Sequence, residues 1–312
     1  MGEWSKTLGE IGESIVGRLL TLIGWGESQT GVPIPCRQGE KHQTSGTPRQ
    51  THGIDRLLSY KCPLVDGLLQ ILIISVKYSD KAYLKNPVPV FKSHLADLAN
   101  TVDCFKTSDA RHLLITPLSG IRKSDDVGVL FWLNNDKTDT NSILPSLAVA
   151  QLPEELNFGT VYVVDNFQAA FLYDAISDIR HRFKDFEVSF FYPDTGKNTN
   201  SRTRATSGPF LPVEHVSSSV LSLRALDPKT TTTILILALN ENFSEDALQR
   251  LAALAQTLSQ GWASKVELGF AAYDETRNNN EVQRVKALFP DKVFTTSLSV
   301  FTYRPDFRTI EE

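Results

Sequence analysis

The chain has 312 residues, of which 41% are hydrophobic and 22% are charged, and its 32 basic and 36 acidic residues give a formal net charge of −4. This balance excludes a protein that holds nucleic acid or an anionic membrane mainly through bulk positive charge, so a site for a polyanion has to be local. A chain of this length has room for two domains of ordinary size.

The cysteines Cys36, Cys62 and Cys104 are far apart in the sequence and follow no metal-ligand spacing. An odd and sparse set of this kind is typical of reduced thiols in a cytoplasm rather than of a disulfide framework. No zinc pattern, Cys-His pair or Ser-His-Asp triad can be assembled from the spacing of the residues alone.

Neither a signal peptide nor a membrane helix is predicted. The first 30 residues carry acids throughout and lack the basic-then-apolar order of a signal peptide. The apolar stretches at 68–76 and 234–239 have about half the length that a membrane helix needs. We therefore expect a soluble, cytoplasmic protein that makes no use of a membrane.

The first half of the chain begins with an amphipathic helix in the segment 9–27, where apolar residues recur at steps of three and four until Gly24 and Gly26 end it. Residues 29–52 are polar and rich in glycine and proline, which indicates irregular chain or a short strand with a loop. The elements predicted next are strands at 53–60 and 69–79 that form a hairpin, a helix at 91–106, strands at 112–118 and 127–133, and a short helical piece near 144–152.

From residue 160 onward, strands and helices alternate. The predicted strands are 161–165, 186–192, 234–240, 265–273 and 293–301, and the predicted helices are 167–183, 244–260 and 279–289. Alternation of this kind indicates a three-layer α/β domain with a mostly parallel sheet. The predicted domains are therefore residues 1–155 and 156–312, the second of which we expect to dock a partner or to sense a ligand.

Three residues of the first half carry the pattern of a known family. Asp55 begins a strand in the segment GID, Lys77 ends the next apolar strand in SVK, and Glu13 lies in GES on the first helix. With the order αβββαβ, they resemble the PD-(D/E)xK, or restriction-endonuclease-like, nuclease superfamily. That family places an acid at the second core strand, an acid-x-Lys triplet on the third and, in many members, a Glu on the first helix. The resemblance covers roughly residues 5–135 and departs at Ser75, where the family usually has Glu, Asp or Gln.

The chemistry of phosphodiester hydrolysis is consistent with these residue types. It needs Mg²⁺, which prefers oxygen ligands, and a positive group near the attacking water and the phosphate. The resemblance implies that Asp55, Glu13 and the carbonyl of Val76 hold Mg²⁺ or Mn²⁺ and that Lys77 orients or deprotonates the water. Ser75 shares a strand face with Lys77, and its hydroxyl would hold a metal-bound water at best.

Each of these residues also has a structural explanation. An Asp after Gly-Ile is commonly a turn residue, a Lys at the end of a buried strand commonly extends to water, and a Glu at the edge of a helix face is commonly solvated. Because a hydroxyl is a poor metal ligand, Ser75 favours an alternative in which the same fold is catalytically degenerate and serves as a protein-interaction or nucleic-acid-binding subunit.

A local excess of basic residues lies next to the predicted site. Five basic residues and two acidic ones occur between residues 29 and 61, and we expect Arg37, Lys41, Arg49 and Arg56 to contact phosphates of DNA, although a solvated loop explains this excess nearly as well. The segments HGIDRLLSYK and ISVKYSDK also resemble nuclease-like subunits of two-protein bacterial anti-phage systems. This resemblance implies a second protein chain as a partner, together with which the chain would cleave DNA.

Overall fold

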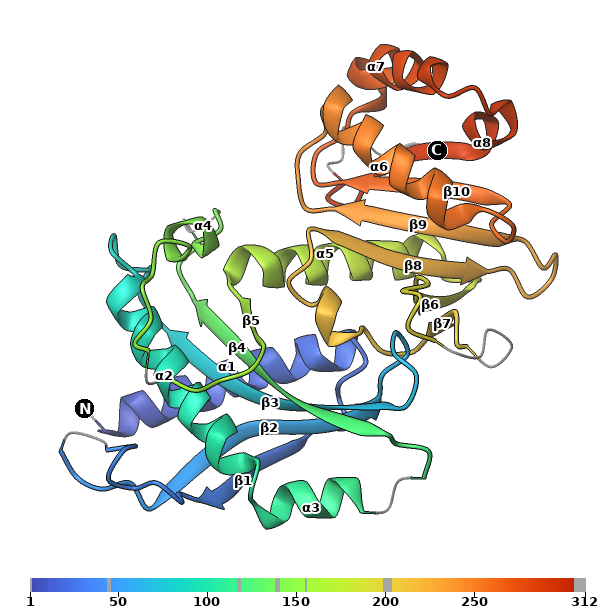
Figure 1. Cartoon of the computed structure of the whole chain (residues 1–312). Coiled ribbons are helices and arrows are strands. Elements are labelled where there is room, and N and C mark those ends of the chain that lie inside the picture. The colour runs from blue at the N-terminus through green and yellow to red at the C-terminus, as the bar shows by residue number, and fades with distance from the viewer. Residues whose placement is uncertain are drawn as a thin grey trace. The chain divides into compact units, whose positions relative to one another are not determined.

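The computed structural model describes residues 2–43, 46–116, 119–137, 141–154, 156–198 and 204–305, and Figure 1 shows the course of the chain. The chain divides into two compact units: Met1–Ala169 with Pro212–Ser217, and Ala170–Leu211 with Ser218–Glu312. Both units combine helices with a sheet of mixed strand direction, which confirms the predicted α/β class.

The first unit is built on a five-stranded sheet in the order β1-β2-β3-β4-β5. Its elements are α1 (Gly2–Leu22), β1 (Gln29–Pro35), β2 (Thr51–Lys61), β3 (Leu68–Ser79), α2 (Val88–Phe105), α3 (Asp109–Ile115), β4 (Lys123–Asn134), α4 (Leu144–Leu147) and β5 (Val161–Val164). Strands β1, β2 and β3 pair antiparallel, whereas β3, β4 and β5 pair parallel. The predicted αβββαβ arrangement is therefore present.

Strand β3 lies at the centre of this sheet, and its first seven residues are buried. Ile71 and Ile73 pack in one apolar cluster with Phe91 and Leu95 of α2. Tyr78 contacts α1 instead, and because side chains alternate along a strand, the two helices cover opposite faces of the sheet (Figure 1). The exposed fraction rises over the last five residues of β3, which include Ser75 and Lys77.

One element of the first unit differs from the sequence prediction. The predicted strand at 112–118 is wrong over its described residues, because the segment Asp109–Ile115 forms helix α3. The Ser108 hydroxyl caps this helix by accepting a hydrogen bond from the Arg111 N–H at 3.3 Å, and Leu113 is 75% exposed. None of the side chains of α3 is fully buried, although Leu114 and Ile115 pack against the core, and residues 117 and 118 lie outside the described residues.

The second unit has a six-stranded sheet in the order β11-β10-β9-β8-β6-β7. Its elements are most of α5 (Asn166–Arg182), β6 (Glu187–Phe191), β7 (Ser207–Gly208), β8 (Val220–Leu226), β9 (Thr233–Leu239), α6 (Glu245–Ser259), β10 (Lys265–Phe270), α7 (Glu275–Leu288), α8 (Lys292–Ser297) and β11 (Leu298–Thr302). The short helix η1 (Val213–His215) belongs to the first unit. Helices α6 and α7 pack on one face of the sheet. Helix α5 covers the other face, where the Phe171 and Tyr303 rings lie 5.7 Å apart (Figure 1).

This sheet is mixed, which corrects the expectation of a mostly parallel one. Strands β9, β10 and β11 are parallel, but β6, β7, β8 and β9 pair antiparallel. Strand β8, which was not predicted, is joined to β9 by the short connection 227–232, and a connection of that length permits only antiparallel pairing. In the described part of the chain, no helix combines the length and the apolar character that a membrane crossing requires.

Candidate active site

Asp55 lies where the pairing of β2 with β3 ends. The register runs from Lys61↔Leu69 to Arg56↔Ile74, and at the next position the Asp55 side chain accepts the Val76 N–H at 2.6 Å through Oδ2. The Ser75 hydroxyl, which shares a strand face with Lys77, acts to lower the pKa of this carboxyl group. Burial raises the pKa of Asp55 above its ordinary value, although the Val76 N–H and the charge of Lys77 oppose the shift.

Glu13 reaches the same region from α1, which approaches β3 closely at Gly12. A Cβ atom on Gly12 would lie 2.4 Å from the Cβ atom of Tyr78, so the helix can come this near only without a side chain there. Burial raises the pKa of Glu13, and the charge of Asp55 raises it further. The Asp55 and Glu13 carboxylates are therefore close enough to repel each other when both are ionised.

Lys77 is paired with Asp97, a residue that the sequence analysis did not identify. The Lys77 ammonium donates to Oδ2 of Asp97 at 2.9 Å, and the Arg49 guanidinium donates to Oδ1 at 2.6 Å. Burial alone would raise the pKa of Asp97, but these two cations outweigh burial and lower it. One signal could have indicated Asp97: it is an acid between the buried apolar positions Leu95 and Leu98 of an amphipathic helix.

A pocket of about 460 Å³ opens beside Lys77. Burial lowers the pKa of His94 to about 4, and the charge of Lys77 acts in the same direction, so this lining histidine is neutral at pH 7. Its ring meets the Trp132 ring edge-on at 5.4 Å. The lining residues are Gly9, Val76, Lys77, Tyr78, Ser79, Lys81, Ala82, Tyr83, Leu84, Val90, His94, Trp132 and Asn134. Cations and aromatic rings that line one pocket suit a phosphate group and a base.

The four basic residues predicted to contact phosphates divide into two pairs. Arg37 and Lys41 are exposed. Arg49 is half-buried and paired with Asp97, and Arg56 is half-buried, with an Nε atom that has no hydrogen-bond partner among the described residues. Only the first pair is thus directed to solvent.

The donors gathered here suit a hard divalent cation. Asp55 and Glu13 provide carboxylate oxygens, the ligand type that Mg²⁺ and Mn²⁺ prefer. Both carboxyl groups have a raised pKa, and a bound cation would favour their ionised forms. The carbonyl of Val76 was expected to be a third ligand. Its N–H donates to the Asp55 carboxylate, so Val76 and Asp55 are adjacent.

Comparison with known families identifies the first unit. The family described as the GAPS4 protein PD-(D/E)XK nuclease domain matches residues 1–168, which is more than half of the 312-residue chain. The matched segment contains Glu13, Asp55, Ser75, Lys77 and Asp97 and every element from α1 to β5. No curated protein and no solved structure matches the chain significantly.

Proposed function

The chain belongs to the GAPS4 PD-(D/E)XK nuclease-domain family, an anti-phage defence family, and we propose that it is a metal-dependent nuclease that hydrolyses phosphodiester bonds in DNA. Nucleases of this superfamily are generally dependent on divalent metals. The observation that carries the proposal is the grouping of Asp55, held by the Val76 N–H, with the Glu13 carboxylate and with the Lys77–Asp97 pair.

In the proposed mechanism, Asp55 and Glu13 hold Mg²⁺ or Mn²⁺. When bound, the cation polarises the phosphate and lowers the pKa of a coordinated water. Lys77 places its ammonium group beside the phosphate, where it orients the attacking water and stabilises the charge that develops on oxygen. The Ser75 hydroxyl acts on the pKa of Asp55, and in this proposal it serves to orient that carboxylate rather than to ligate the cation.

Asp97 is the positioning residue of this site. It holds the Lys77 ammonium at 2.9 Å and the Arg49 guanidinium at 2.6 Å, so both long side chains are fixed beside the strand end. Its charge also acts on Asp55 and raises the pKa of that carboxyl group. We propose that α2 thereby supplies the acidic charge that Ser75 does not provide on β3.

A partner subunit belongs to the proposal. A net charge of −4 gives the chain a weak unaided grip on a polyanion. We therefore propose that DNA is held together with a second protein chain in the cytoplasm. Residues 156–312, as a second domain, would dock this partner or sense a ligand.

Ser75 favours one alternative function. Without an acid at this position the site has fewer carboxylates than the family pattern, and a chain of this kind could serve as a non-catalytic subunit that binds protein or nucleic acid. The two functions differ in a measurable way, because a degenerate site binds no divalent cation whereas the proposed nuclease does.

Cleavage of plasmid and linear duplex DNA by the full chain, with Mg²⁺ or Mn²⁺ and after chelation, tests the proposal. We expect metal-dependent cleavage that falls by about 100-fold or more in Asp55→Asn and in Lys77→Met. Asp66→Asn is the matched control, since Asp66 lies in the turn between β2 and β3 and forms an exposed ion pair with Arg122. Unchanged rates in both site variants, with the fold intact, would refute the assignment.

A further inference from the structure

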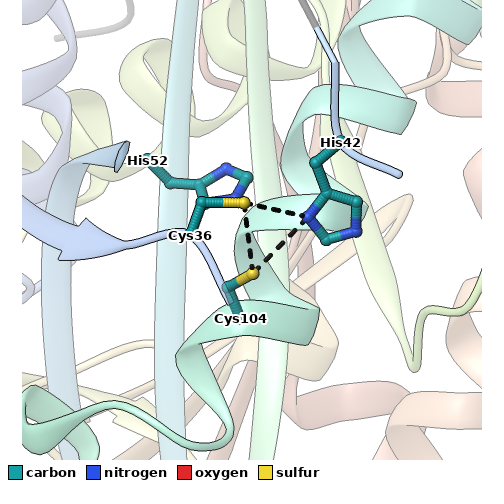
Figure 2. A group of neighbouring side chains, drawn as sticks. All are labelled: Cys36, His42, His52 and Cys104. Atoms are coloured by element: carbon teal, nitrogen blue, oxygen red, sulfur yellow. Dashed lines mark hydrogen bonds between the residues drawn. The ribbon is translucent and has the colours of Figure 1, made fainter. Parts of the chain in front are cut away.

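Two cysteines and two histidines meet within the first unit, although they are widely separated in sequence (Figure 2). Cys36 directly follows β1, His42 lies in the connection to β2, His52 lies in β2, and Cys104 lies in the last turn of α2. Each offers one ligand atom, and the four atoms lie within 4.8 Å of one another. His42, His52 and Cys104 are buried, and Cys36 is half-buried.

The distances among three of these atoms fit the edges of one coordination tetrahedron. Nδ1 of His42 lies 3.6 Å from Sγ of Cys36 and 3.4 Å from Sγ of Cys104, and the two sulfur atoms are 3.9 Å apart. Around a zinc ion with Zn–S of about 2.3 Å and Zn–N of about 2.05 Å, the corresponding edges are about 3.6 Å for S–N and about 3.8 Å for S–S. The side chains are thus spaced for an ion between them.

The fourth side chain, His52, is oriented by a neighbour on α2. Its Nδ1 atom lies 3.3 Å from Oγ1 of Thr101, and the Thr101 hydroxyl already donates to the Asp97 carbonyl at 2.8 Å. The Thr101 oxygen therefore accepts from the Nδ1–H group, which leaves the lone pair on Nε2. That Nε2 atom is buried in a side chain with 0% exposure and has no hydrogen-bond partner among the described residues. An unpaired buried ring nitrogen of this kind is costly unless a ligand uses it.

The chemistry of these four donors selects the metal. Sulfur and imidazole nitrogen in a tetrahedral S₂N₂ set favour Zn²⁺, whereas Mg²⁺ and Mn²⁺ prefer oxygen. The backbone N–H of Arg37 donates to the Cys104 sulfur at 3.4 Å, a contact that stabilises a thiolate. We propose that Cys36, His42, His52 and Cys104 form a structural Zn²⁺ site, separate from the oxygen site of Asp55 and Glu13.

The proposed site would link the β1–β2 connection to α2. The connection is folded back on itself, because the Arg49 N–H donates to the Gly39 carbonyl at 3.0 Å and the Cys36 N–H donates to the Gln50 carbonyl at 2.8 Å. Zinc would fix this folded segment to the end of α2, and with it Arg49, whose guanidinium holds Asp97. The ion would thus stabilise the Arg49–Asp97–Lys77 arrangement without taking part in catalysis.

The metal content of the full chain tests this inference without DNA, so its outcome is independent of any cleavage activity. Protein purified without chelator, incubated with Zn²⁺ and desalted is expected to carry one zinc ion per chain by plasma mass spectrometry. The Cys36→Ser/Cys104→Ser double variant is expected to lose at least about 90% of the zinc, as removal of two of four ligands from a structural site requires. Cys62→Ser is the matched control, because Cys62 is buried but lies outside the cluster, and it should keep the zinc.

A cobalt spectrum of the wild-type chain keeps the test decisive if the double variant fails to fold. Replacement of the ion by Co²⁺ is expected to give the thiolate-to-cobalt charge-transfer bands and the intense visible bands of a tetrahedral site. Absence of zinc and of these bands in the wild-type chain would overturn the inference. So would equal zinc in the folded double variant, or a Cys36–Cys104 disulfide in the chain as purified.

Discussion

Asp55 and Asp97 both interact with the charge of Lys77, but their surroundings shift their pKa values in opposite directions. Burial dominates at Asp55 and raises its pKa, whereas Lys77 and Arg49 outweigh burial at Asp97 and lower its pKa. A raised pKa means that the fold disfavours the ionised carboxylate, and a lowered pKa means that the fold favours it. Removal of the charge should therefore change stability in opposite directions at the two positions.

For Asp55→Asn we expect an increase of about 1 kcal/mol in the free energy of unfolding at pH 7.5, without added divalent cation. The amide oxygen can still accept the Val76 N–H, while the buried charge is gone. Because the folded pKa is raised, the penalty on the wild type exists only where Asp55 is ionised. The difference should vanish below about pH 3.9, the unfolded pKa of aspartate. Urea denaturation at the two pH values measures it, and a loss of stability at pH 7.5 would contradict it.

For Asp97→Asn we expect a decrease of about 1–2 kcal/mol in the free energy of unfolding at pH 7.5, because two half-buried cations lose their partner. The folded pKa of Asp97 is lowered, so the cost should shrink as the pH falls through that value. Asp66→Asn breaks an exposed pair with Arg122 and should cost less than about 0.5 kcal/mol in the same titration. Equal effects of the two substitutions would exclude the positioning role of Asp97.

At the scale of single residues, the sequence indicates some site residues and not others. Asp55 stands out as an acid at the start of a predicted strand, and Lys77 stands out as a cation at the end of the next, apolar strand. Cys36 and Cys104 are separated by 68 residues and become neighbours only through the pairing of β1 with β2 and the packing of α2. Because their spacing in the sequence gives no sign that they meet, the sequence alone indicates two unrelated thiols.

At the scale of elements, the approach of α1 to the sheet decides where Glu13 lies. For Gly12→Ala we expect a loss of about 1–3 kcal/mol of stability and a weaker divalent-cation affinity, since the new methyl group would meet Tyr78 at 2.4 Å and displace the helix. Gly9→Ala is the matched control on the same helix, because a Cβ atom there meets nothing within 4 Å. It should stabilise the chain by up to about 1 kcal/mol through helix propensity. Thermal and urea unfolding check both variants.

The sequence predicts the elements correctly where an apolar repeat extends over several helical turns. The prediction fails where a helix cap or a turn determines the local structure. The amphipathic patterns of α1 and α2 extend over several turns, and both helices occur where the period places them. The short run HLLITPL contains apolar residues that suit either a strand or a helix, and the Ser108 cap selected the helix. Strand β8 was missed although its residues 221–225 alternate between apolar and polar, a pattern that indicates a strand.

At the scale of the whole molecule, the net charge of −4 limits how the chain can hold DNA. For the Arg37→Ala/Lys41→Ala double variant we expect weaker DNA binding at low salt and a log–log salt slope that is reduced by about 1.8, since two exposed cations are removed. Lys229→Ala, an exposed substitution in the connection between β8 and β9, should change neither value. Fluorescence anisotropy across a salt series measures the slope, and an unchanged slope would place the phosphate contacts elsewhere.

The most direct test of the account is a calorimetric titration of Mn²⁺ into the full chain whose Cys/His site has first been saturated with Zn²⁺. It requires neither DNA nor a partner and separates the proposed nuclease from a degenerate subunit. The account predicts saturable Mn²⁺ binding to the wild type, at least about tenfold weaker in Asp55→Asn and unaltered in Asp66→Asn. A wild-type chain that binds no Mn²⁺, or an Asp55→Asn variant that binds it equally well, would contradict the account.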